Sequence, residues 1–268
     1  MIDYNKFSSM LSNHIGKYDF DFVYDLLVTI VKNPTRYTGI FRVTNAKTKL
    51  IQNVTQSQEI KFGDFMENII TEYISKMGYI NLPKNIGKDD EGNLLNADQV
   101  FTYNNSSIYL IEQKIRDDHD STKKRGQYSN FQRKINCLKK QYPNKEIVAV
   151  MWFIDDTLTK NKNFYTQQIH SEKIDNVRIY IKYGKELFDD IFGKVCVWNE
   201  ICEHLYKNKQ ERTRNIIDIP DFDTSNDVKQ AILLLKEKEP TLYKKLMSND
   251  PKYINLRQEL FPSGNTLV

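Results

Sequence analysis

The sequence contains few cysteines, and their spacing predicts neither a set of disulfide bonds nor a zinc-binding motif. Its three cysteines, Cys137, Cys196 and Cys202, are odd in number and include no CxxC pair. Disulfide-rich domains and zinc fingers depend on such pairs, so neither is predicted. Free thiols in a reducing cytoplasm are the simplest interpretation.

The sequence also lacks long apolar runs. None approaches the ~18 residues that a membrane-spanning helix requires. The first twenty residues, MIDYNKFSSMLSNHIGKYDF, have no basic segment followed by an apolar one, so no signal peptide is predicted. With 40% hydrophobic and 28% charged residues, the composition is typical of a soluble globular protein. We therefore expect a cytoplasmic protein with no membrane partner.

Two common catalytic motifs are missing as well. His14, His170 and His204 are dispersed, with no serine or cysteine nucleophile signature beside them, so a hydrolytic triad has no support. The glycine-bearing stretch NIGKDDEG lacks the spacing of a phosphate-binding loop, so use of ATP is not predicted.

The positive charge of the chain is concentrated in one segment. The net charge is +4, whereas residues 114–145 carry ten basic and three acidic residues, a difference of +7. Such an excess can neutralise the phosphates of a nucleic acid. A solvated helix face would carry the same charges, so charge alone leaves both interpretations open.

The order of periodic segments predicts an α/β fold. Apolar residues at helical spacing indicate a helix within 57–79, with Asp64 as its N-cap and Glu67 as the capping-box partner. Short strands and turns are predicted for 38–56. Residues 99–103 and 108–115 are predicted to form a hairpin around the turn NNSS. Further strands are expected at 146–154 and 176–183, and further helices at 129–142 and 184–193.

These elements predict a mixed central sheet between helices, within a domain of residues 1–195. Its core is expected at about residues 60–193, after an elaboration of helices and strands at 1–59. Residues 196–268 show mostly helical patterns, as in VWNEICEHLYKNKQER and NDVKQAILLLKEKEPTLYKKLM. They are predicted to form a helical C-terminal extension.

Glu112 and Lys114 end an otherwise apolar strand, and this is the feature that most suggests chemistry. Alternate side chains of a strand share a face, so both lie on the face of Ile108 and Leu110. A buried charge requires a partner or a metal ion. The pair is therefore either a structural ion pair or part of a site.

Asp98 favours the second interpretation. It begins the preceding strand, fourteen residues before Glu112, and a hairpin would bring the two carboxylates together. Two carboxylates make an oxygen-rich site for a hard divalent cation, most naturally Mg²⁺. Lys114 would stabilise charge or orient an attacking water. The alternative is that Asp98 is only a turn or strand-edge residue.

An aspartate, a hairpin, a Glu-x-Lys triplet and a helix together resemble the core of the PD-(D/E)xK nucleases. The matching text is NAD (96–98) and EQK (112–114), with Ala97 where the family name has proline. The segments KIRDDHDSTKKRGQ and YIKYGKELFDDIFG also resemble those of type II restriction endonucleases. The resemblance implies Mg²⁺-dependent, sequence-specific cleavage of double-stranded DNA by Asp98, Glu112 and Lys114, in an enzyme paired with a DNA methyltransferase.

Many such enzymes are homodimers that match a palindromic site, and the C-terminal helices would serve dimerisation or DNA recognition. Two alternatives stay open. One is a non-catalytic nucleic-acid-binding protein in which Glu112 and Lys114 form an ion pair. The other is a PD-(D/E)xK nuclease of DNA repair or of another defence system.

Further residues are predicted to belong to the site or to contact DNA. In nucleases of this kind an earlier helix adds a glutamate to the metal site, which Glu67 matches, although a capping role is the alternative. The cluster from Asp117 to Asp120 is interpreted as a polar loop with helix-capping groups rather than a metal cluster. The residues expected to contact DNA are Arg116, Lys123, Lys124, Arg125, Gln127, Asn130, Arg133 and Lys134.

Overall fold

The computed structural model describes residues 1–15, 18–171, 174–212 and 218–267. The chain divides into two compact units, which are described separately. Unit 1 comprises residues 1–10 and 63–208, and unit 2 comprises residues 11–62 and 209–268. This division differs from the one expected at residue 195, because residues 11–62 group with the C-terminal helices. The functional roles of the two parts stay predictions.

Unit 1 is built on a five-stranded mixed sheet. Its strand order is β1 (Ile80–Asn81), β4 (Gln99–Tyr103), β5 (Ser107–Lys114), β6 (Glu146–Phe153) and β7 (Val177–Tyr183). The first two pairings are antiparallel, and β5, β6 and β7 are parallel to one another. Strands β2 (Asn85–Lys88) and β3 (Leu94–Asn96) form a separate hairpin. The predicted hairpin and both later strands are confirmed.

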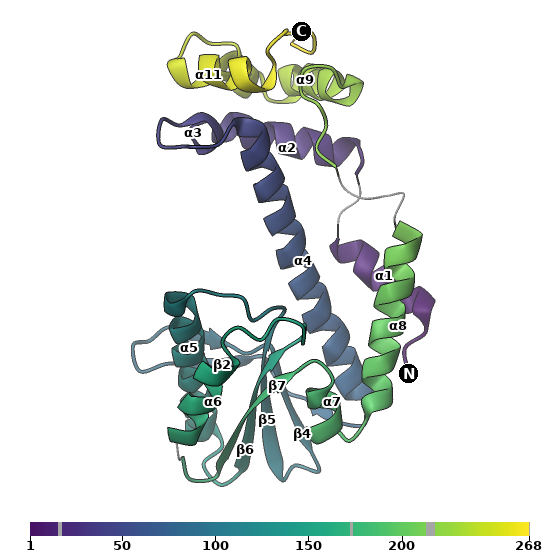
Figure 1. Ribbon diagram of the computed structural model, residues 1–268, viewed down its shortest axis with the longest axis vertical. Coiled ribbons are helices and arrows are strands. Elements are labelled where there is room, and N and C mark those ends of the chain that lie inside the picture. Colours follow the sequence, from purple (N-terminus) through teal and green to yellow (C-terminus); the bar gives the residue numbers. More distant parts are fainter. Residues whose placement is uncertain (16–17, 172–173, 213–217, 268) are drawn as a thin grey trace. The chain divides into compact units, whose positions relative to one another are not determined.

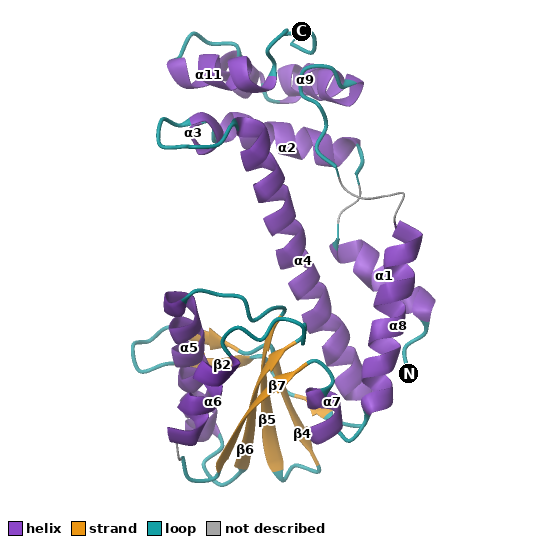
Figure 2. Ribbon diagram, in the orientation of Figure 1, coloured by secondary structure: helices purple, strands orange, loops and turns teal. Residues whose placement is uncertain are grey.

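Helices cover both faces of this sheet (Figures 1 and 2). The crossovers between the parallel strands are α5 (Ser121–Gln141) and α6 (Lys162–Ser171), as parallel pairing requires. Phe131, Ile135 and Leu138 of α5 join Ile108 and Leu110 of β5 in one core. The other face receives the last part of α4 (Ala46–Lys76), the short α7 (Glu186–Asp190) and α8 (Val195–Arg212). The predicted α/β class is therefore confirmed.

Helix α4 corrects two predictions. Residues 46–76 form one continuous helix, so the strands predicted within 38–56 are wrong, and the predicted turns are confirmed only before the helix, at residues 40–44. The helix begins after Asn45, whose Oδ1 accepts a hydrogen bond from the N–H of Thr48 at 2.8 Å. Asp64 and Glu67 lie inside the helix, so their predicted capping roles are wrong too. The residues of its first half that pack on the core of unit 2, Ala46, Leu50 and Val54, recur every four residues, which is close to the helical period.

Unit 2 is helical. It contains the last four residues of α1 (Tyr4–His14), then α2 (Phe20–Lys32), α3 (Thr35–Thr38) and the first part of α4, followed by α9 (Asn226–Lys238), α10 (Pro240–Leu246) and α11 (Pro251–Leu260). Its core joins buried residues of α2 to those of α9 and α11, including Leu27, Ile30, Ile232, Leu235 and Leu256. The C-terminal helices are thus confirmed, with a break where Pro240 begins α10.

Within the described ranges, no helix combines the length and the apolar character needed to cross a membrane.

Candidate active site

The β4–β5 hairpin brings Asp98 beside the end of β5. Asn104 and Asn105 form the turn with φ angles of 50° and 56°, which asparagine tolerates better than most residues. Gln99 pairs with Ile111, so the residue before Gln99 lies level with Glu112. Asp98 Oδ2 accepts a hydrogen bond from the main-chain N–H of Gln113 at 2.6 Å. The antiparallel register therefore places Asp98 close to Glu112, as the sequence spacing predicted.

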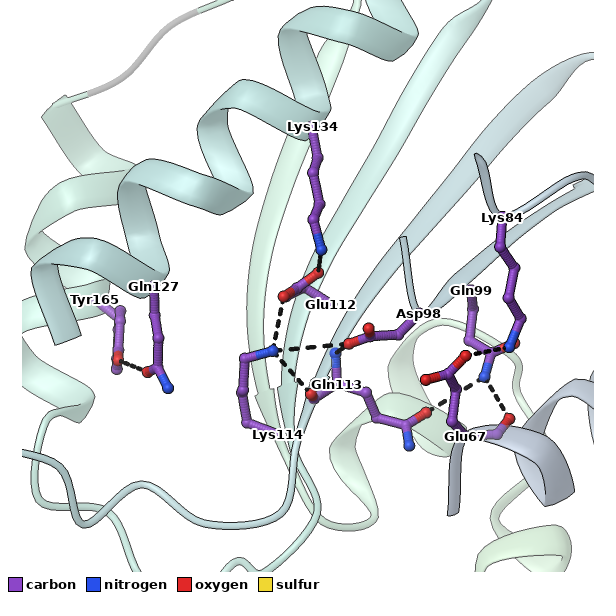
Figure 3. Close-up of polar contacts among 10 residues, drawn as sticks. All are labelled: Glu67, Lys84, Asp98, Gln99, Glu112, Gln113, Lys114, Gln127, Lys134 and Tyr165. Atoms are coloured by element: carbon purple, nitrogen blue, oxygen red, sulfur yellow. Dashed lines mark hydrogen bonds and ion pairs between the residues drawn. The ribbon is translucent and has the colours of Figure 1, made fainter. Parts of the chain in front are cut away.

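Glu112 is held by two lysines (Figure 3). Lys114 Nζ donates to its Oε1 at 2.7 Å, and Lys134 Nζ donates to its Oε2 at 2.5 Å. The side chains of Glu112 and Lys134 are almost fully buried, with 3% and 6% of their surface exposed. Two ammonium groups on one carboxylate compensate for the cost of burying it. The Glu112–Lys114 pair therefore belongs to a larger charged cluster.

Three oxygens surround the Lys114 ammonium. Its Nζ lies 2.7 Å from Glu112 Oε1, 3.1 Å from the main-chain oxygen of Gln113 and 3.7 Å from Asp98 Oδ2. Figure 3 shows these contacts converging on one nitrogen. The protein thus already holds one cation at the point where its carboxylate and carbonyl oxygens meet.

The cluster shifts the pKa of two of its members. Burial and the neighbouring Glu112 charge raise the pKa of Asp98 to about 6, although Lys114, Lys134 and the Gln113 N–H oppose the rise. Burial alone would lower the pKa of Lys114, but the charges of Glu112 and Asp98 outweigh it and raise that pKa above its ordinary value. A buried carboxylate beside a second carboxylate is a position that favours a bound cation.

The donor set fits a hard divalent cation. Carboxylate and carbonyl oxygens are the ligands that Mg²⁺ and Ca²⁺ prefer, and these are the atoms around Lys114 Nζ. Only two carboxylates take part: among the described residues, no three His, Cys, Asp or Glu side chains gather closely enough to form a metal cluster. Water would supply the remaining ligands, as it commonly does for Mg²⁺.

Glu67 lies to one side of this cluster. Its carboxylate is directed at Lys84, with Oε1 2.5 Å from Lys84 Nζ (Figure 3). Its main-chain oxygen accepts a hydrogen bond from Gln99 Nε2 at 2.7 Å, which ties helix α4 to strand β4. The structure therefore brings Asp98, Glu112 and Lys114 together but pairs Glu67 with a different lysine. The other glutamate considered on this helix, Glu72, pairs with Lys6.

The residues expected to contact DNA fall into two groups. Lys123, Arg125 and Arg133 are exposed, and Arg116 lies partly exposed in the loop before α5. The other four are buried or only partly exposed and contact other side chains. Lys124 lies 4.7 Å from the ring centroid of Phe164, Gln127 accepts a hydrogen bond from the Tyr165 hydroxyl, Asn130 accepts one from Arg133, and Lys134 is buried against Glu112.

The exposed residues differ in how far their charge is compensated and in where they lie on α5. Arg133 Nη1 pairs with Asp89 Oδ2 at 2.9 Å, so its charge is partly offset. Lys123 and Arg125 lie in the first turns of α5. Lys134 points into the protein, so the expected contact with a DNA backbone does not suit it. Lys134 instead pairs with Glu112 inside the cluster.

The acidic loop before α5 is structural. Asp117 is fully buried and accepts hydrogen bonds from the main-chain N–H of Asn161, the Asn161 amide and the Tyr183 hydroxyl, at 2.8, 2.8 and 2.9 Å. Asp120 is the N-cap of α5 and accepts from the N–H of Lys123. The interpretation as a polar loop with a capping group is confirmed.

Lys134 is the site residue whose place sequence reasoning missed. A usable signal was present: Lys134 lies between Phe131 and Leu138 on the apolar stripe of α5, next to Ile135. A lysine on a buried helix face requires an acidic partner. The sequence does not say which acid that is, because the pairing depends on how α5 packs on β5.

The chain is similar in sequence to proteins of one known family. The family model of the HinfI type II restriction endonucleases matches residues 4–89 and 76–209, which together span more than half of the chain. The type II restriction enzyme HinfI of Haemophilus influenzae is 22% identical to this protein over 232 residues. The match covers 81% of this chain and 78% of that enzyme.

Proposed function

Because the chain belongs to the HinfI family of type II restriction endonucleases, and is therefore a site-specific deoxyribonuclease, we propose that Asp98, Glu112 and Lys114 carry out the cleavage. The observation that supports this most is the convergence of Asp98 Oδ2, Glu112 Oε1 and the Gln113 carbonyl oxygen on the Lys114 ammonium. We propose that this cluster is a PD-(D/E)xK centre that works with Mg²⁺ on double-stranded DNA.

Asp98, Glu112 and the Gln113 carbonyl are the groups that would hold the cation. When bound, a divalent cation polarises a phosphodiester and makes a coordinated water more acidic. Lys134 stays on Glu112 Oε2 and keeps that carboxylate compensated and oriented, which leaves Oε1 as the oxygen that faces the Lys114 ammonium. Lys134 is thus proposed to be a positioning residue.

Lys114 is proposed to act on the phosphate. Its ammonium donates hydrogen bonds from the rim of the site, where 24% of its side chain is exposed. Charge develops on the phosphate oxygens as water attacks, and a preorganised cation stabilises that charge more than it stabilises the ground state. In-line hydrolysis would leave a 5′-phosphate and a 3′-hydroxyl.

Glu67 is proposed at most to support the site. Its carboxylate is paired with Lys84, and its main chain anchors Gln99. The Gln99 amide in turn lies 3.5 Å from Gln113 Oε1, on the strand that carries Glu112. Loss of the Glu67 carboxylate should therefore disturb activity less than loss of Glu112.

The exposed residues Lys123 and Arg125 and the partly exposed Arg116 are proposed to contact the DNA backbone beside this site. They lie between the end of β5 and the second turn of α5, and phosphate contacts of this kind fix the register of a protein on DNA. Two further proposals follow from the family alone. The enzyme would act as a homodimer on a symmetric site, and a DNA methyltransferase would protect the host.

The test is cleavage of a long, fully sequenced and unmethylated DNA, with Mg²⁺ in one reaction and EDTA in the other. Discrete fragments are expected in the Mg²⁺ reaction and not in the EDTA reaction. The ends of these fragments identify the DNA sequence that is cleaved. Discrete fragments in EDTA would contradict the metal dependence. Intact DNA in both reactions, from protein shown to be folded, would contradict the proposed function.

A further inference from the structure

The loop between α3 and α4 presents the most exposed large apolar side chains in the described part of the chain. Ile40, Phe41 and Val43 have 88%, 92% and 102% of their surface exposed, and the next residue of this kind, Tyr206, has 66%. Figure 1 shows the loop extending beyond α3 within unit 2. Apolar groups concentrated at such a tip mark a surface that contacts another molecule.

The loop is anchored at both ends, so its tip has a defined base. Tyr37 before it and Ala46 after it are buried in the core of unit 2. A tight turn carries the tip, in which the N–H of Arg42 donates to the Gly39 oxygen at 2.8 Å. Ile40 and Phe41 occupy the two corner positions of this turn. A β-carbon on Gly39 would lie 2.5 Å from the Thr35 oxygen, so the close approach requires glycine.

The chain segment that carries the tip has charge of one sign, although acidic residues of other segments contact it: Lys32 lies 3.8 Å from Glu239, and Glu259 accepts a hydrogen bond from the N–H of Ala46 at 2.6 Å. Residues 26–58 contain five basic residues and no acidic residue, a difference of +5, whereas the whole chain carries +4. The five are Lys32, Arg36, Arg42, Lys47 and Lys49. Arg42 lies between Phe41 and Val43 at the tip itself. An apolar tip within a basic, acid-free segment is complementary to a polyanion that also offers an apolar surface.

An open groove lies beside the turn. Its volume is about 570 Å³, and residues 38–42 line one part of it while Pro251, Lys252 and Asn255 line another. Arg42 and Lys252 are the charged residues of the lining. Lys252 Nζ lies 2.9 Å from Asp250 Oδ2, so Arg42 supplies most of the groove's uncompensated charge.

We propose that the turn Gly39–Arg42, with Val43, is a DNA wedge: its apolar tip enters the minor groove and partly unstacks a base step, while the flanking basic residues contact phosphates. Proteins that bend DNA insert apolar side chains such as Phe and Ile between base pairs and hold the minor groove with Arg and Lys. The proposal rests on the chain being a DNA endonuclease. It does not depend on which residues perform the cleavage.

A second copy of the chain is a less suitable occupant of this surface. A two-fold interface places a patch against itself, so Arg42 would approach its own counterpart within a segment that has no acidic residue to compensate. Like charges that face each other oppose association. Duplex DNA supplies both the negative charge and the stacked apolar bases, so it satisfies both halves of the surface.

The experiment measures binding without cleavage, in EDTA, to a duplex that contains the mapped cleavage site. Base analogues whose fluorescence rises on unstacking are placed at successive steps on either side of the site. The variants are Phe41→Ser and Ile40→Ser, singly and together. The matched control is Ile60→Ser, which alters another isoleucine of unit 2 with 60% of its surface exposed. Because Ile40, Phe41 and Ile60 are exposed, all variants should unfold at the same temperature as the native protein.

Native protein should raise the fluorescence at one step. The double variant should abolish that rise and bind about tenfold more weakly, as expected for the loss of apolar contacts with bases. The control should do neither. Unchanged binding and fluorescence in the double variant would overturn the proposal. So would a change in oligomeric state of the double variant without DNA, because that result would make the tip a protein interface.

The proposed cleavage site and the proposed wedge can be tested independently. If Glu112→Gln retains cleavage, the site assignment is wrong, but the fluorescence result in EDTA still decides the wedge. Arg42→Gln provides an independent test, because it removes charge and leaves the apolar tip. It should reduce the salt dependence of binding by about one counterion, while the fluorescence rise persists at saturating protein.

Discussion

Lys134 Nζ lies 2.5 Å from Glu112 Oε2, and it reaches this carboxylate from helix α5 while both side chains are almost fully buried. The pair joins the helix to the strand at the point where the proposed cleavage site begins. It also separates the two oxygens of Glu112, since Lys134 contacts one and Lys114 the other.

Replacement of Lys134 by Met should strongly destabilise the protein. Removing one partner of a buried ion pair costs about 3–5 kcal/mol when the remaining charge is uncompensated. Lys114 still contacts Glu112 Oε1 after this change, so the cost should lie toward the lower end of that range. Urea unfolding measures this cost. Lys140→Met is the matched control, because Lys140 forms its pair with Asp90 at an exposed position on the same helix, and it should have a much smaller effect.

The double variant Lys134→Met, Glu112→Gln shows whether the cost comes from the pair. Replacing both partners removes the buried charge, so the double variant should be more stable than Lys134→Met alone. A double variant that is less stable by the full sum of the two single changes would contradict a coupled pair.

The raised pKa of Asp98 makes stability depend on pH. Its folded pKa of about 6 lies above the ordinary value of 3.8, so the folded state binds the proton more tightly than the unfolded state. This contribution to stability is complete below pH 3.8 and is lost as the pH rises through 6. Asp98→Asn should flatten the dependence between these values, measured by urea unfolding at several pH values. An unchanged slope would contradict the assignment to Asp98.

Removal of the Lys114 ammonium should strengthen cation binding. The ammonium occupies the meeting point of Asp98 Oδ2, Glu112 Oε1 and the Gln113 carbonyl, so it competes with a divalent cation for the same oxygens. At a pH well above 6, calorimetric titration with Ca²⁺ should show several-fold tighter binding to Lys114→Met than to the native protein. Weaker binding would contradict the shared position.

Salt dependence should separate the basic residues of α5. Lys123→Gln or Arg125→Gln should each reduce the slope of log affinity against log salt by about one, if that residue contacts a phosphate. Arg133→Gln should change it less, because Asp89 partly compensates Arg133. Binding in EDTA at several salt concentrations measures these slopes. Equal slopes for all three variants and the native protein would contradict the proposed backbone contacts.

The sequence predicts the central sheet because that part of the fold is encoded locally. The alternation in β5, the apolar run of β6 and the NNSS turn each lie within a short stretch. Antiparallel register then follows from the turn, and register alone places Asp98 opposite Glu112. The core of the site is predictable for that reason.

The remaining features depend on tertiary packing that no local pattern reveals. Glu67 matches a metal-binding glutamate in kind, yet Lys84 from the β1–β2 connection takes its carboxylate. The apolar stripe of α5 predicts that Lys134 is buried, but only the packing of α5 on β5 shows that its partner is Glu112. Residues 11–62 join the C-terminal helices through a shared core of α2 and α9, which distance along the chain conceals.

The most direct test of the central claim compares three variants on one duplex that contains the mapped site, with Mg²⁺, under single-turnover conditions. Glu112→Gln and Lys114→Met should lose cleavage by several orders of magnitude while they still bind the duplex. Glu67→Gln, whose carboxylate pairs with Lys84 instead, should retain most of it. Near-native cleavage by either of the first two variants would contradict the assignment of the active site.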